Sequence, residues 1–285
     1  MFAQTADSEG ISNILDQYGS RLQKKTINMS LMAVVKGCKT ASLQEAIECV
    51  DLLIQWNANI NSEVEGGKTA LMMACEKGYL ELVTTLIDHG ALVTLKDTKK
   101  RTPLMYAIGA QAQNGDVIQE LINRNANVNE QTMTGTTPLL LATQKGYASI
   151  VRKLLANGAD LKHQGGDQQN SALHSACAKG DISTLHAILE YCRREMAKSE
   201  QVHEFIYLKN RKGKTAFEVA EEEYGRHPDD KNREEVFREL KSFYEAKEKE
   251  VEEVQNLLIK EVDESLTSKS NSTPQQNPEK QKTKS

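Results

Sequence analysis

The tripeptide Thr137-Pro138-Leu139 belongs to a phrase that occurs four times in this chain with small changes. The four copies are Thr69-Ala70-Leu71, Thr102-Pro103-Leu104, Thr137-Pro138-Leu139 and Ser171-Ala172-Leu173. Their leucines lie 33, 35 and 34 residues apart, and three residues after each leucine stands an alanine: Ala74, Ala107, Ala142 and Ala176. A fixed period of this length is typical of a chain of stacked repeats, in which each unit buries its apolar face against its neighbours.

Each unit also carries an apolar pair, which predicts a second helix. The pairs lie 18 or 19 residues before the next leucine, at Leu53-Ile54, Leu86-Ile87, Leu121-Ile122 and Leu154-Leu155. Four residues after the first member of each pair stands glycine or asparagine: Asn57, Gly90, Asn125 and Gly158. These residue types are expected where a helix ends in a left-handed conformation. The threonine or serine that opens each phrase is expected to cap the first helix of its unit.

Together these features resemble the ankyrin repeat, a turn followed by two helices and a hairpin-like loop. The resemblance implies an all-α solenoid of paired helices with hairpin-like loops. A first unit uses Leu31 and Val34, and the period resumes at Gly213-Lys214-Thr215-Ala216-Phe217 after a departure from the pattern. We predict about five repeats and a partial sixth over residues 28–226.

The N-terminal segment, residues 1–27, is predicted to contain a capping helix. Its apolar residues Ile11, Ile14, Leu15 and Tyr18 have helical spacing. An open end of a solenoid needs a cover with a polar outer face, and this helix can provide one. A membrane-surface helix is the alternative, but basic residues do not flank the segment on both sides.

The C-terminal segment is predicted to form a helix over residues 229–266, followed by a disordered tail over 267–285. The apolar stripe of the helix is interrupted once, by Lys247; its members are Val236, Leu240, Phe243, Val251, Val254, Leu258 and Val262. We expect a solvated helix whose first turns cap the array; a short coiled coil is the alternative. The tail is too polar to offset the entropy of ordering. The Glu-rich run 245–253 before a polar tail resembles the secretion signals of bacterial effectors with ankyrin repeats.

Composition excludes several classes of function. The 285 residues carry a formal net charge of −4, which disfavours nucleic-acid binding. The sequence contains no apolar run near the length of a membrane-spanning helix, so we expect no membrane association. The five cysteines show no Cys-x-x-Cys spacing, which is consistent with a reduced, cytoplasmic compartment, or with a host cytosol if the protein is a secreted effector.

Catalytic and metal sites are not predicted. His174 and Cys177 lie three residues apart and can share one helix face, but both occupy positions that the ankyrin phrase fills with core residues. A metal set of His174, Cys177, His186 and Cys192 matches no structural zinc spacing. We therefore expect no catalytic residue, no metal and no cofactor. Only the stretch from Glu190 to Tyr207 has room for a hidden catalytic element.

Cations recur at equivalent places in the units and predict a partner surface. One set of cations stands just before the turn between the two helices of a unit, and a second set stands just before the opening threonine. Further cations lie in two of the loops. Together the candidates are Lys68, Lys77, Lys99, Lys100, Arg101, Lys145, Lys179, Lys212 and Lys214. Stacking of the units is expected to align them on one concave face. The partner that fits such a face is an acidic or phosphorylated protein segment. These positions lack the aromatic residues that stack on nucleic-acid bases.

Four further residues are candidates for contact or modification. Trp56, the only tryptophan, occupies a second-helix position that is polar in the other units. We expect either a contact anchor or packing on the N-terminal helix or on the long first turn. Met133 lies at the tip of a loop and is a second candidate anchor. Asn61 and Asn129 each follow a leucine by eight residues, which resembles the setting that asparaginyl hydroxylases modify. The alternative is that both asparagines only bond loop backbone groups.

The sequence thus predicts a non-enzymatic protein-interaction module that binds a partner segment on the concave face of an ankyrin-like array. A monomer is expected, with self-association through the C-terminal helix as the alternative. The second hypothesis for function is a secreted bacterial effector that targets a host protein and carries a small hidden catalytic element.

Overall fold

A computed structural model describes residues 8–18, 23–39, 42–110, 114–195 and 201–270 of the chain. The described residues form helices α1 to α14 and one two-stranded antiparallel hairpin, in which Glu63 pairs with Thr69 and Val64 with Lys68. The predicted all-α repeat fold is therefore confirmed.

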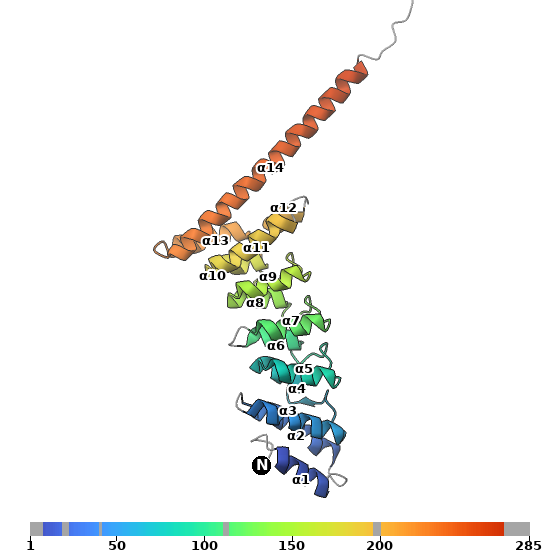
Figure 1. The fold of residues 1–285 in the computed structure, drawn as a ribbon. Coiled ribbons are helices and arrows are strands. Elements are labelled where there is room, and N and C mark those ends of the chain that lie inside the picture. Colours follow the sequence, from blue (N-terminus) through green and yellow to red (C-terminus); the bar gives the residue numbers. More distant parts are fainter. Residues whose placement is uncertain (1–7, 19–22, 40–41, 111–113, 196–200, 271–285) are drawn as a thin grey trace, which may run out of the picture. The chain divides into compact units, whose positions relative to one another are not determined.

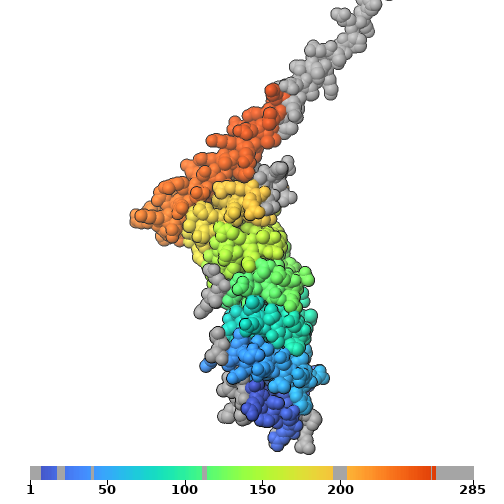
Figure 2. Space-filling view, viewed as in Figure 1, coloured from blue at the N-terminus to red at the C-terminus, as the bar shows by residue number. Residues whose placement is uncertain are grey.

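The helices stack in two rows, and each helix packs on the equivalent helix of the next unit (Figure 1). The row of first helices consists of α2 (Lys24–Gly37), α4 (Ala70–Lys77), α6 (Pro103–Gly109), α8 (Pro138–Lys145), α10 (Ala172–Lys179) and α13 (Ala216–Arg226). The row of second helices consists of α3 (Leu43–Gln55), α5 (Leu80–Asp88), α7 (Gly115–Asn123), α9 (Ala148–Ala156) and α11 (Ile182–Glu195). In the space-filling view the units follow one another as successive bands in chain order (Figure 2). The remaining elements are α1 (Ser8–Tyr18), β1 (Glu63–Val64), β2 (Lys68–Thr69), α12 (Gln201–Ile206) and α14 (Lys231–Ser270).

The hydroxyl groups that open the repeated phrases cap the first helices, as predicted. The Thr69 side chain accepts a hydrogen bond from the backbone N–H of Met72, and Thr137 accepts one from Leu140. The same bond recurs at Thr102, Ser171 and Thr215. Each cap satisfies one of the N–H groups that a helix start leaves without a partner. The threonine or serine of the phrase therefore fixes where α4, α6, α8, α10 and α13 begin.

The second helices end as the glycine and asparagine pattern predicts. Asn57 and Asn125 have φ angles of 66° and 64°, and Gly90 and Gly158 have φ angles of 91° and 81°. This left-handed conformation lets the alanine that follows donate its N–H to a carbonyl in the last turn, as Ala91 does to Leu86 at 2.9 Å. The chain thereby leaves α3, α5, α7 and α9 in the same direction.

The core consists of the repeated apolar residues. Leu71, Leu104, Leu139 and Leu173 are all fully or almost fully buried, as are the alanines of the same phrases. Each buried leucine contributes roughly 2 kcal/mol from the apolar surface that it removes from water. Since no unit has a core of its own, this free energy depends on the neighbouring units.

The N-terminal helix α1 covers the row of second helices. It packs on α3, with Ile11 and Leu15 buried. The next helix, α2, begins at Lys24, ahead of the predicted start of the array at residue 28. The first unit lacks the threonine phrase, and the residue before α2, Gln23, makes no side-chain cap, so the sequence carries no signal for this start.

The chain divides into two compact units, residues 1–238 and 239–285. Within the first unit, the beginning of α14 packs on α13: the Phe237 ring stacks on Tyr224 at 5.4 Å and lies 5.5 Å from Phe217. Val236 is buried. The first turns of α14 therefore close the C-terminal end of the repeats.

The second unit consists of the rest of α14, which continues as helix to Ser270, past the predicted end at residue 266. Val254, Leu257 and Ile259 are exposed apolar side chains on this helix. The side chains of Leu258 and Val262 and the tail residues 271–285 lie outside the described residues. Self-association through this helix stays a prediction.

Asparagine side chains connect successive units near the ends of their second helices. Asn129 donates from Nδ2 to the carbonyl oxygen of Gly158 at 2.9 Å and accepts from the N–H of Asp160 at 2.8 Å. Asn61 makes the same two contacts with Gly90 and Leu92, at 3.1 and 2.9 Å. The carboxamide nitrogen and oxygen of each asparagine are thus both hydrogen-bonded to backbone groups at the end of the next second helix, so these residues join successive repeats.

We expect Asn129→Ala to lower the free energy of unfolding by about 1–2 kcal/mol, because it removes two hydrogen bonds between units. The matched control is Asn123→Ala, since Asn123 bonds only Gln119 within its own helix. Urea unfolding followed by circular dichroism measures both variants. Equal stabilities of the two variants would show that the bonds between units contribute nothing.

Candidate functional site

Five loops connect the second helix of one unit to the first helix of the next. We call them the fingers; they comprise residues 62–68, 95–101, 130–136, 163–170 and 208–214. Backbone hydrogen bonds join each finger to the next: Thr98 N to Gly66 O, Met133 N to Lys99 O, Gly166 N to Thr134 O and Arg211 N to Gln168 O, all between 2.8 and 3.0 Å. The fingers therefore form one hydrogen-bonded series, which we call the finger ribbon.

The close approach of two fingers requires glycine. An added Cβ at Gly165 would lie 2.1 Å from the carbonyl oxygen of Gly135. No real Cβ atom tolerates such a contact, so any other residue at position 165 would push the third and fourth fingers of the series apart.

Polar side chains brace the fingers from inside. Asp97 Oδ1 accepts from the N–H groups of Lys99 and Arg101 at 2.9 and 2.7 Å. Asn210 Oδ1 accepts from those of Lys212 and Lys214 at 3.0 and 3.1 Å. In each of these two fingers, one side-chain oxygen thus accepts from two backbone N–H groups and fixes the turn.

Asp97 is buried and central to a second set of contacts. Its Oδ2 accepts from Arg101 Nε at 2.7 Å and from the Tyr106 hydroxyl at 2.8 Å. Burial alone would raise the pKa of Asp97, but the hydrogen bonds from Arg101 and Tyr106 lower it overall. Burial, and then the bond to Asp97, raises the pKa of Tyr106, which therefore stays protonated. The carboxylate is an ionised brace for its finger.

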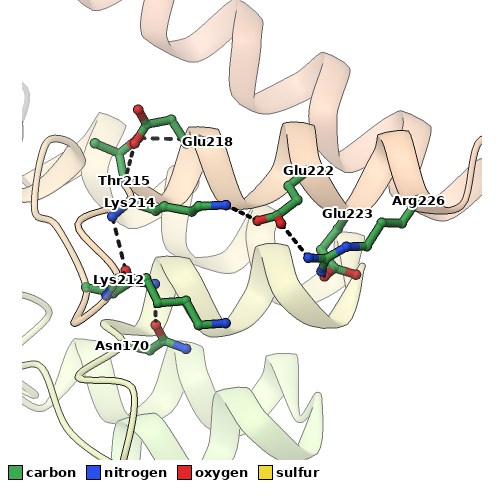
Figure 3. A network of polar contacts seen from close by, with 9 residues as sticks. Asn170, Lys212, Lys214, Thr215, Glu218, Glu222, Glu223 and Arg226 are labelled. Atoms are coloured by element: carbon green, nitrogen blue, oxygen red, sulfur yellow. Dashed lines mark hydrogen bonds and ion pairs between the residues drawn. The ribbon is translucent and has the colours of Figure 1, made fainter.

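Three of the cations predicted for partner binding are engaged in internal contacts. Lys68 pairs with Glu76 at 3.0 Å, and its ammonium lies 4.7 Å from the centre of the Tyr106 ring. Arg101 is held by Asp97 and Tyr106. Figure 3 shows Lys214 reaching Glu222, which in turn contacts Arg226. The structure thus gives Lys68, Arg101 and Lys214 a role in holding the repeats.

Two other predicted cations join neighbouring units. Lys77 Nζ donates to the carbonyl oxygen of Cys38 at 3.0 Å, and Lys179 Nζ donates to that of Gln144 at 3.2 Å. Both acceptors lie near the end of the preceding first helix, where carbonyl groups lack helical partners. These two lysines therefore also serve the stacking of units.

The remaining predicted cations are exposed. Lys99, Lys100 and Lys212 project from fingers, and Lys145 ends α8. In the part of the chain that the structure describes, none of the four makes an ion pair. They are the predicted lysines whose charge is available to a partner.

The two candidate apolar anchors differ in exposure. Met133, at a finger tip, is 69% exposed, the largest fraction among the exposed apolar side chains of the described residues. Trp56 is half-buried at the end of α3. Met133 is therefore the better-placed anchor for a partner.

A hollow of about 680 Å³ lies along the finger ribbon, next to Met133. Its lining includes Lys100, Met133, Thr134, His163, Gln164 and Arg211. Neither His163 nor Arg211 is among the contact residues predicted from the sequence, because only the stacking of fingers brings them beside Lys100. The basic run 209–214 in the sequence was the available signal for Arg211.

His174 and Cys177 are structural residues. The His174 ring bonds Ser171 Oγ through Nδ1 at 2.8 Å and the carbonyl oxygen of Lys214 through Nε2 at 2.9 Å, so both nitrogens are engaged. Burial lowers the pKa of His174, although the bond to Lys214 raises it in part. Burial raises the pKa of the Cys177 thiol to about 12. These two residues offer neither a free base nor a thiolate nucleophile.

The stretch from Glu190 to Tyr207, which had room for a catalytic element, contributes to the core where it is described. Cys192, Phe205 and Ile206 are buried. Among the described residues no group of three histidine, cysteine, aspartate or glutamate side chains is placed to hold a metal ion.

Comparison with known proteins identifies the repeats. The sequence profile described as ankyrin repeats, in three copies, matches residues 38–114 and 108–198, more than half of the chain. This protein belongs to the ankyrin-repeat family. The family is typically non-catalytic, and its repeats serve as protein-binding modules.

Relatives include regions of much longer proteins. The chain is 33% identical over 138 residues to the ankyrin repeat and KH domain-containing protein mask-1 of Caenorhabditis elegans, covering 48% of this chain and 5% of that protein. It is 30% identical over 141 residues to the neurogenic locus notch homolog protein 1 of Homo sapiens, covering 49% and 5%, respectively. It is 35% identical over 113 residues to the neurogenic locus Notch protein of Drosophila melanogaster, covering 39% of this chain and 4% of that protein. The chain thus spans only about a twentieth of the length of these relatives.

None of the helices that the structure describes combines the length and the apolar character that a membrane crossing requires.

We expect Asp97→Asn to lower the free energy of unfolding by about 2–3 kcal/mol at neutral pH, because it removes a buried charge-assisted acceptor. The pKa of Asp97 is lower in the folded state, so its contribution is complete above the unfolded pKa of about 4 and is lost as the pH falls through the folded pKa. Urea unfolding at neutral and acidic pH measures this dependence. The control Asp88→Asn affects only an exposed pair with Arg124 and should change stability by less than about 1 kcal/mol. A gap between wild type and Asp97→Asn that persists in acid would contradict the ionised brace.

We expect Cys75 and Cys177 to resist thiol reagents in the folded protein, since both are buried and burial raises the pKa of each thiol. Labelling with a disulfide reagent near neutral pH should be slow in buffer and fast in denaturing urea. Mass spectrometry of the labelled peptides assigns each site. Rapid labelling of Cys177 in the native protein would contradict its role as a buried packing residue and would support the catalytic hypothesis.

Proposed function

We propose that this ankyrin-repeat module binds an acidic or phosphorylated segment of a partner protein on its finger face, the surface formed by the fingers and the first helices. The observation that carries the proposal is the exposure of Lys99, Lys100, Lys145 and Lys212 on this face. Cations that make no ion pair among the described residues can pair with a ligand without first breaking such a contact.

The finger face is also rigid. The backbone bonds of the finger ribbon and the braces at Asp97 and Asn210 hold the fingers in place before a partner arrives. A preformed surface loses little conformational entropy on binding, which favours affinity. The exposed lysines would raise the association rate by attracting an acidic segment.

Charge is distributed unequally between the two rows of helices. Several acids of the second helices are paired with cations of a neighbouring unit: Asp88 contacts Arg124 at 2.7 Å, and Glu190 contacts Arg152 at 3.4 Å. These contacts use cations of the second row internally, whereas Lys99, Lys100, Lys145 and Lys212 of the finger face make no ion pair among the described residues. The five fingers contain no Phe, Tyr or Trp for base stacking, so a protein segment fits better than nucleic acid.

The second hypothesis, a secreted bacterial effector, rests on the composition of the C-terminal segment alone. Hydroxylation of Asn61 and Asn129 likewise stays a prediction, since their bonds between units account for both asparagines.

Affinity purification with quantitative mass spectrometry tests the proposal. We expect the double variant Lys99→Glu/Lys100→Glu and the single variant Lys145→Glu to recover each specific partner about tenfold less well, which corresponds to about 1.4 kcal/mol. With the purified partner, association should slow as salt increases. The matched control Lys153→Glu places the same charge change on α9, in the second row of helices.

The melting temperature of every variant should stay close to that of the wild type, because the changed side chains are exposed or half-buried. Partner recovery that is unaffected by both finger-face variants, or reduced as much by Lys153→Glu, would refute the proposal.

A further inference from the structure

The hollow beside Met133 extends over four consecutive fingers, from the one that carries Lys100 to the one that carries Arg211. The backbone bonds from Met133 to Lys99, from Gly166 to Thr134 and from Arg211 to Gln168 connect these four fingers. The floor of the hollow is therefore continuous and does not depend on the position of a single loop.

The chemistry of the hollow is cationic at its two ends. The lining residue Lys100 is exposed, and its backbone is held in the left-handed conformation with a φ of 58°. At the other end, Arg211 makes one long contact, from Nη1 to the carbonyl oxygen of Asp167 at 3.4 Å, and its other guanidinium donors are not used by the described residues. The only acidic side chain of the lining is that of Asp167 itself.

The middle of the hollow is lined by polar side chains. His163 Nε2 donates to the carbonyl oxygen of Gly135 at 2.7 Å, which holds the ring against the neighbouring finger. The hydroxyls of Thr132, Thr134 and Thr136 form a chain with distances of 3.0 and 3.1 Å. The Met133 side chain is 69% exposed and is the one exposed large apolar group of the lining.

We propose that this hollow binds an extended peptide that carries an acidic group at each end and an apolar side chain between them. One carboxylate or phosphate pairs with Lys100, the other pairs with the guanidinium of Arg211, and the apolar side chain packs on Met133. This inference rests on the proposed function and names the part of the finger face that recognises the partner segment.

The physical features of the hollow favour an extended chain over other ligands. A helix that docks in a groove needs a row of apolar contacts, and the hollow offers a single one. A small-molecule site is lined mostly by apolar and aromatic groups, whereas this lining consists largely of threonine, glutamine, glycine and charged residues. An extended strand places alternate side chains on one side, so acidic and apolar side chains of one peptide can all face the fingers.

A peptide selection tests this inference with the full chain. A phage library of random peptides of about ten residues, which span roughly 33 Å when extended, is panned on the immobilised protein. We expect enriched peptides to carry Asp or Glu near both ends and an apolar residue in the middle. Their affinities for wild type and variants are then measured by fluorescence polarisation.

The variants separate the hollow from the rest of the finger face. We expect Lys100→Glu and Arg211→Glu each to weaken the best peptide about tenfold and Met133→Asp to weaken it about fivefold, magnitudes in the range of ordinary interface truncations. Lys145→Glu, on α8 outside the lining of the hollow, and Lys153→Glu, on α9, should change the affinity for this short peptide by less than about twofold, although Lys145 contributes to binding of a longer partner segment. If a reversal lowers the melting temperature, Lys100→Gln and Arg211→Gln replace it.

Several results would overturn the inference. They are an absence of enrichment, enriched peptides without acidic residues, and equal affinities of wild type, Lys100→Glu and Arg211→Glu. Peptides that depend on Lys145 alone would overturn the hollow as the site and leave the proposed function in place. Replacement of the peptide's Glu by phosphoserine distinguishes the two acidic groups, since tighter binding assigns the site to phosphate and weaker binding assigns it to carboxylate.

Discussion

No repeat of this chain can bury its own apolar face, and the rest of the structure depends on this constraint. The phrase leucines and alanines are buried because the first helices pack on one another from α4 to α13, unit after unit. A repeat without neighbours would leave these side chains in water. The two ends of the array therefore need covers, which α1 and the first turns of α14 provide within residues 1–238.

The polar contacts between units follow from the same constraint. Stacking brings loops from successive units side by side, and their backbone groups then need partners. The finger ribbon satisfies them through bonds such as Met133 N to Lys99 O, and Asn61 and Asn129 satisfy others at the ends of the second helices. The surface that would meet a partner is thus held by the bonds that stabilise the array, so recognition and stability share one set of contacts.

The same contacts divide the cations into two groups. Arg101 stabilises the Asp97 brace, and Lys77 caps the preceding unit, so neither is available without a loss of stability. Lys100 and Lys145 make no ion pair with the described residues. A charge on the finger face therefore indicates a binding role only after its internal contacts are known.

The sequence by itself determined the repeats, their helix starts at threonine or serine, and their left-handed ends at Asn57 and Asn125, because these features depend on local backbone chemistry. It also determined that His174 and Cys177 occupy core positions, since both fall inside the repeated phrase. Only the tertiary structure decided which lysines are free and that Lys100, His163 and Arg211 line one hollow. Lys100 and Arg211 are more than a hundred positions apart in the sequence, yet they line the same hollow. The distance between stacked units decides which fingers lie side by side and which carbonyl groups a lysine can bond, and no local sequence pattern encodes that distance.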